Sequence, residues 1–93
     1  MYVFTAQFYL RLPSRTLKEK RGIVKSILAR GRNSFNVAAA EVDRQDDPGS
    51  ALLAFVTVSE SRVQARRLLE QLEERVVKER PDLEVVEVEI EEC

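Results

Sequence analysis

The basic side chains between Ser14 and Asn36 are the residues whose types and spacing could do chemistry. Residues 11–32 hold eight lysines and arginines and a single acid, Glu19. At 3.6 residues per turn, four of these bases fall on one stripe beside the apolar face of a helix, with a fifth at its start: Lys18, Arg21, Lys25 and Arg32, with Arg15 flanking. Such a stripe can neutralise phosphates and release counterions. The sequence predicts these five as nucleic-acid-binding residues, with Arg11 able to reach them from the preceding segment.

The alternative is that this charged helix face is only a solvated one, as on the charge-rich surfaces of thermophile proteins. The net charge is −1, so the chain as a whole has no reason to attract nucleic acid. The shortage of acids among these bases favours a binding surface, because a solvated face usually mixes both signs. Residues 81–93 show the reverse pattern, with six acids and no base.

Catalysis and metal binding find little support in the composition. The chain has no histidine, and its one cysteine, Cys93, is the last residue. The commonest general base and metal ligand are therefore missing, and no nucleophile–base pair can be assembled. The acids Glu41, Asp43, Asp46 and Asp47 lack the spacing and glycine of a calcium loop. We expect a non-enzymatic protein with no catalytic residues, no metal and no cofactor.

Periodic patterns predict the elements that carry the basic stripe. Tyr2 to Leu12 alternates between apolar and mixed positions, which predicts a long strand with one buried face. Thr16 to Glu19 fits a capping box, with Ser14 as an alternative cap. In the helix that follows, Gly22 suggests close approach of a strand or ligand. Gly31 recurs at helical spacing with the apolar Val24 and Ile27, and it could equally be the C-terminal cap.

The rest of the chain predicts two strands, a second helix and a last strand. Phe35 to Asp43 and Ala51 to Val58 predict two strands joined by a turn at 44–49, although the small side chains of the first segment also permit a helix. Ser59 is expected to cap a helix that ends before Pro81. The last strand, Leu83 to Ile90, alternates, with three apolar residues expected on one face: Val86, Val88 and Ile90.

The predicted fold class is α+β: a ferredoxin-like βαββαβ sandwich with a four-stranded antiparallel sheet and two helices on one face. One domain is expected over residues 1–93, with the first and third strands central. Acylphosphatases share this fold and bind phosphate with an arginine and an asparagine. The glycine-rich loop they need is absent before Arg15, so Asn33 or Asn36 supports only an analogy.

Two motifs carry a family resemblance. TLKEKR at 16–21 followed by FNVAAAEV at 35–42 resembles the YlxP-like family of small bacterial proteins of unknown function, and the likeness extends through ALLAFVTVSES. The resemblance implies a ferredoxin-like fold. Its members are commonly encoded beside translation-initiation and small-subunit ribosome-assembly factors, which implies ribosome-associated work. The family brings no catalytic residues, and the loop DDPGS is shorter than in relatives and lacks tryptophan.

The partners expected from these observations are structured RNA or the small ribosomal subunit. The alternative is a protein–protein module or homodimer, in which the basic helix meets the acidic last strand or the open sheet faces pair, with Val3, Tyr9, Leu83 and Val85 as the apolar surface. A third option is a small anion bound near Ser14 to Leu17. No apolar run is long enough to span a membrane, and the N-terminus lacks a secretory signal, so a cytoplasmic protein is expected.

Overall fold

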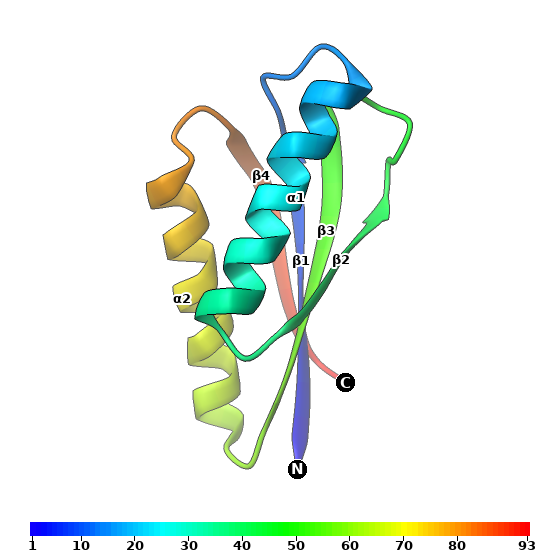
Figure 1. Ribbon diagram of the computed structural model, residues 1–93. Coiled ribbons are helices and arrows are strands. Elements are labelled where there is room, and N and C mark those ends of the chain that lie inside the picture. Colours follow the sequence, from blue (N-terminus) through cyan, green and yellow to red (C-terminus); the bar gives the residue numbers. More distant parts are fainter.

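A computed structural model describes all residues, 1–93, and contains one four-stranded antiparallel sheet and two helices (Figure 1). The strands lie in the order β2-β3-β1-β4. The elements follow one another as β1 Tyr2–Arg11, α1 Leu17–Ser34, β2 Ala38–Asp43, β3 Ser50–Ser59, α2 Arg62–Glu79 and β4 Glu84–Glu92. The predicted βαββαβ order, the antiparallel sheet and the central pair β1–β3 are confirmed.

Both helices cover the same face of the sheet, and the core lies between the two layers (Figure 1). The alternation predicted for β1 is confirmed, because Phe4, Ala6, Phe8 and Leu10 are all buried. The rings of Phe8 and Phe55 pack 5.2 Å apart across the β1–β3 pair. From α2, Ala65, Leu69, Leu72 and Val76 complete this core.

The capping box that starts α1 is confirmed. Thr16 is the N-cap, its hydroxyl accepts from the Glu19 amide, and the Glu19 carboxylate accepts from the Thr16 amide. Ser14 is not a cap: its buried hydroxyl donates instead to the Pro48 carbonyl at 2.6 Å. This bond ties the segment before α1 to the β2–β3 loop.

The close approach expected at Gly22 and the C-cap alternative for Gly31 are wrong, whereas the placement of Gly31 on the buried apolar face of α1 is confirmed. No neighbouring atom lies within 4 Å of a β-carbon built on Gly22, so no other element packs closely against this residue. Gly31 is inside the helix, which continues to Ser34 and is capped by Phe35. A β-carbon on Gly31 would stand 2.9 Å from the Phe55 ring, so Gly31 is the position of close contact between α1 and the sheet.

Three further expectations change with tertiary pairing. The second strand begins at Ala38 rather than Phe35. Ser61, not Ser59, caps α2, while the Ser59 hydroxyl accepts from the Ser61 amide. A register shift between Tyr9 and Leu10 makes a β-bulge opposite them in β4, where the pairing passes from Glu87 to Val85.

The bulge changes which apolar residues of β4 face the helices. One extra residue in a strand reverses the alternation beyond it. Leu83 and Val85 therefore pack against the core together with Val88 and Ile90, while Val86 is 40% exposed. The predicted grouping of Val86 with Val88 and Ile90 is wrong, and so is the placement of Leu83 and Val85 on the open sheet face.

Candidate nucleic-acid interface

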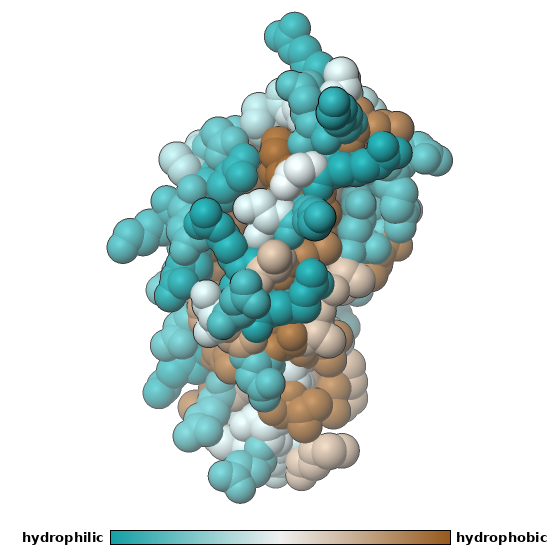
Figure 2. Space-filling model, in the orientation of Figure 1, coloured by the Kyte–Doolittle hydropathy of each residue, from teal (hydrophilic) through white to brown (hydrophobic).

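The five predicted binding residues are all exposed on α1 or just before it. Their side chains form no ion pair with any acid of the chain. They are Arg15, Lys18, Arg21, Lys25 and Arg32, called here the α1 basic stripe. Figure 2 shows hydrophilic side chains spread over this side of the molecule, along α1. The structure therefore brings the predicted residues together on one accessible surface.

The stripe lies on the side of α1 nearer β2. The Arg32 guanidinium donates to the Ala39 carbonyl of β2 at 3.0 Å, which fixes one end of the stripe. The other side of α1 faces α2, since the Arg30 guanidinium pairs with Glu79 of α2 at 2.8 Å. The expected reach of Arg11 to the stripe is wrong, since its guanidinium pairs with Glu84 of β4 at 3.0 Å.

The N-terminus of α1 is filled by the chain's own carboxylate. Glu19 Oε1 accepts from the amides of Arg15 and Thr16 and from the Thr16 hydroxyl, each at 3.2 Å. These hydrogen bonds, led by the Arg15 amide, hold the pKa of Glu19 below its ordinary value. An anion at this helix end would have to displace Glu19, so the geometry does not favour an anion site at Ser14 to Leu17.

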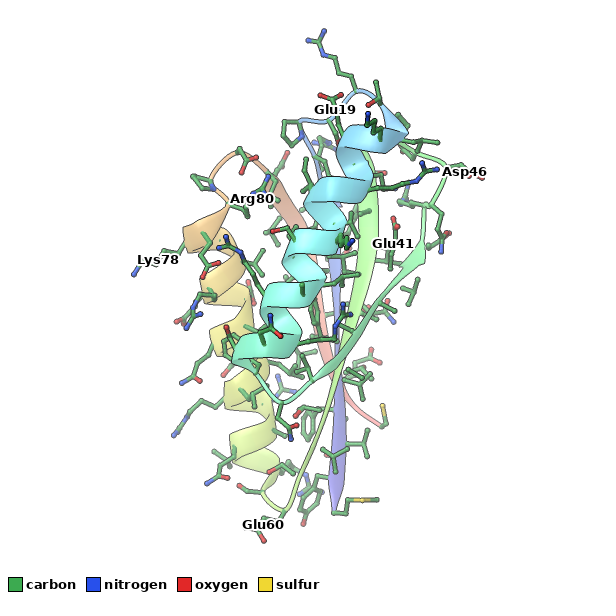
Figure 3. All side chains as sticks on the ribbon, in the orientation of Figure 1. Glu19, Glu41, Asp46, Glu60, Lys78 and Arg80 are labelled. Atoms are coloured by element: carbon green, nitrogen blue, oxygen red, sulfur yellow. The ribbon has the colours of Figure 1, made fainter.

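Lys20 differs from the other bases of α1 because it is buried. Its ammonium lies 2.9 Å from Glu41 Oε2 and donates to the carbonyls of Asp47, at 2.7 Å, and Arg44. Figure 3 shows Glu41 next to α1 and Asp46 out on the β2–β3 loop. Sequence reasoning counted Lys20 only as part of the basic stretch. Its spacing from the buried Val24, Ile27 and Gly31 was the available signal that it faces the sheet.

The acids of the β2–β3 region serve local structure. The Asp43 carboxylate accepts from the Arg44 amide, and that of Asp47 accepts from the Gly49 amide and the Ser50 hydroxyl. The Ser50 hydroxyl is the main cause that lowers the pKa of Asp47, followed by the Gly49 amide. No cluster of three or more Asp, Glu, His or Cys side chains is arranged to hold a metal ion.

The face of the sheet opposite the helices offers no platform for stacking bases. Phe55 is fully buried on the helix side of β3. Tyr9 lies on the open face, but the Arg44 guanidinium sits 4.5 Å from its ring centre. Beside Tyr9, Glu87 and Glu89 of β4 line the same shallow depression, which opposes phosphate. The open face of the sheet therefore does not favour nucleic-acid binding.

Neither helix is long and apolar enough to cross a membrane.

Among known families, the model for "Protein of unknown function (DUF503)" matches residues 3–90. The "Uncharacterized protein YlxP" of Bacillus subtilis (strain 168) is 40% identical over 57 residues, an alignment that covers 61% of this chain and 62% of that relative. These likenesses agree with the resemblance carried by TLKEKR and FNVAAAEV.

Proposed function

We propose that this chain, which belongs to the DUF503 family of proteins of unknown function, is a non-enzymatic RNA-binding protein that uses the α1 basic stripe, with structured ribosomal RNA as its target class. The observation that supports the proposal is the free charge of the stripe. Five exposed bases on one surface have no acidic partner in their own chain. The family that the chain resembles is commonly encoded beside small-subunit ribosome-assembly factors, and this supports the same class of target.

The dimensions of the stripe suit a phosphate backbone. Lys18 and Arg32 are fourteen residues apart, which is ~21 Å along a helix axis. Neighbouring members three or four residues apart are separated by ~5–6 Å between β-carbons. A helix of this length presents its charges in a row. Four phosphate contacts on a duplex give a slope of about −4 for the logarithm of the binding constant against the logarithm of the salt concentration, or about −3 on a single strand.

The opposite face of the molecule sets the orientation of binding. Glu87, Glu89 and Glu91 of β4 are exposed on the sheet side, away from the helices. Their charge repels phosphate, so RNA approaches from the helix layer. A chain with a net charge of −1 binds RNA in this way only if one surface carries the positive charge.

Titration of the protein with a structured fragment of small-subunit ribosomal RNA, at several salt concentrations, tests the proposal. The double variant Lys18→Glu with Lys25→Glu removes two contacts and adds two repulsive charges. We expect its affinity to fall by at least about tenfold, and its salt slope to become shallower by about 2.

The matched control is Arg67→Glu with Lys78→Glu, which makes the same change in net charge at exposed, unpaired positions of α2. If binding depends on the stripe, this control keeps a salt slope close to that of the unmodified protein. The proposal is wrong if the α1 double variant leaves affinity and slope unchanged, or if both double variants weaken binding equally.

A further inference from the structure

The sheet face opposite the helices carries a largely apolar surface. It is interrupted by the exposed Gln7 of β1, opposite Ala54, and Arg44 of the same chain covers it only at Tyr9. It spans β1, β3 and β2, whose outward residues alternate with the buried ones. Val58 is 50% exposed and Val42 is 47% exposed. We call this set the open apolar face: Val3, Thr5 and Tyr9 of β1, Leu52, Ala54, Val56 and Val58 of β3, and Ala38, Ala40 and Val42 of β2.

This face has relief as well as apolar character. Around Ala38, Ala40 and Ala54 the surface is hollowed, and every residue that lines the hollow is apolar, including Val42 and Val56. Small side chains beside the valines make a surface into which the valines of a facing sheet can fit. Its projected area is about 400 Å², from two strands of ten residues and one of six spaced ~4.8 Å apart. A standard interface takes ~800 Å² from each partner, so this face gives a small interface.

Acidic residues border the open apolar face along β4. Glu89 stands opposite Gln7 and Glu91 opposite Thr5 in the β1–β4 pairing. If two copies met with β4 over β4, these rows would repel each other. A two-fold axis parallel to the strands avoids this contact, because it lays the β4 edge of one copy toward the β2 edge of the other.

The register supplies a charge pair for that arrangement. Tyr9 pairs with Glu87 on one side and with Leu52 on the other, and Leu52 pairs with Asp43, which precedes Arg44. Glu87 and Arg44 therefore lie at the same level on opposite edges of the sheet. A two-fold axis along the strands brings the backbone of Arg44 of one copy to the level of Glu87 of the other, and the Arg44 side chain reaches that carboxylate by turning from Tyr9 toward the β2 edge.

Arg44 is fixed by contacts on both sides of the β2–β3 loop. It is the one non-glycine residue with a positive φ, 65°, a conformation unfavourable for a residue with a β-carbon. Its carbonyl accepts from the buried Lys20 ammonium, and its guanidinium lies over Tyr9 on the open face. The loop is thus anchored from inside while its charge is presented to the outside.

We propose that the open apolar face binds the same face of a second copy of this chain, forming a two-fold homodimer in which Arg44 meets Glu87 of the partner. Relief and charge both fit this occupant, since one surface must complement itself, and the small area predicts a weak dimer. The inference does not depend on RNA binding, because it uses the other side of the molecule.

Sedimentation equilibrium over a range of concentrations tests the dimer. We expect a mass of twice 10.7 kDa for the unmodified chain. Val58→Lys, on the open face, should raise the dimer Kd at least about tenfold, since it buries an unpaired charge. The matched control is Val77→Lys on α2, where the valine is equally exposed at 50%. It should leave the dimer Kd unchanged, and circular dichroism checks that both variants fold.

Charge reversal tests the arrangement of the two copies. Arg44→Glu and Glu87→Arg should each weaken the dimer, and the two together should restore most of the loss. The proposal is overturned if the unmodified chain stays monomeric up to ~1 mM, where the association free energy is only about −4 kcal/mol. It is also overturned if Val58→Lys and Val77→Lys behave alike, or if the combined reversal restores nothing.

Discussion

At the scale of single residues, Lys20 is the one charged residue that is buried. Its side chain is 2% exposed, and its ammonium is surrounded by the Glu41 carboxylate and two loop carbonyls. Glu41 Oε2 is fully enclosed and has the Lys20 ammonium as its close polar neighbour. Burial of such a pair is costly, but breaking it is worse, because the remaining charge is then left without a partner.

Lys20→Met should therefore lower the free energy of unfolding by about 3 kcal/mol. The variant leaves the Glu41 carboxylate without its cationic partner, and it leaves the carbonyls of Arg44 and Asp47 without their hydrogen-bond donor. Adding Glu41→Leu should recover a large part of the loss, since an apolar pair of similar size replaces the ion pair. A double-mutant cycle by urea unfolding measures this, and simple additivity of the two losses would contradict the assigned pairing.

At the scale of elements, α1 contains two glycines in opposite environments. Gly22 points into open space, whereas Gly31 rests against Phe55 and Leu72. Helix propensity alone favours alanine at both positions by up to about 1 kcal/mol. Packing decides otherwise at Gly31, because the nearest atom belongs to the ring of Phe55, a fully buried residue.

The same substitution should accordingly have opposite effects at the two sites. Gly22→Ala should raise the free energy of unfolding by up to about 1 kcal/mol. Gly31→Ala should lower it by about 1–2 kcal/mol, because the Phe55 ring must shift to admit a methyl group. Urea unfolding of the two variants side by side is the measurement. Stabilisation by both would show that α1 does not pack on β3 as closely as described.

At the scale of the whole molecule, the two proposed surfaces lie on opposite sides. The α1 basic stripe is on the helix layer, and the open apolar face is on the far side of the sheet. In the proposed dimer the sheets face each other, so both stripes remain on the outside. The two interactions should then be independent in energy, as expected for sites without shared contacts.

Independence can be measured directly on variants already described. Lys18→Glu with Lys25→Glu should leave the dimer Kd within about twofold, and Val58→Lys should leave the salt slope of RNA binding unchanged. Sedimentation equilibrium and salt titration give these values. Dissociation of the dimer by the stripe variant would mean that copies associate through the basic helix and the acidic β4, in place of the open faces.

Much of the fold could be predicted because it rests on local periodicity. The alternation of Phe4, Ala6 and Phe8 predicts the buried face of β1, and Thr16 with Glu19 predicts the start of α1. The exposed stripe could also be predicted, since helical spacing alone places Lys18, Arg21 and Lys25 away from the sheet. Its role in binding remains a prediction.

Other features depended on contacts between distant parts of the chain. The bulge in β4 arises from its pairing with β1, and it reverses which side Val85 faces. Lys20 is buried because its acceptors, Glu41, Arg44 and Asp47, come from a strand and loop more than twenty residues away.

The basic surface of α1 was thus determined by the sequence itself, because charge and helical spacing are local properties. Only the tertiary structure decided that Lys20 does not belong to that surface and that Arg44 lies over Tyr9. Both depend on where the β2–β3 loop lies against α1 and the sheet, and that placement follows from the packing of the whole chain.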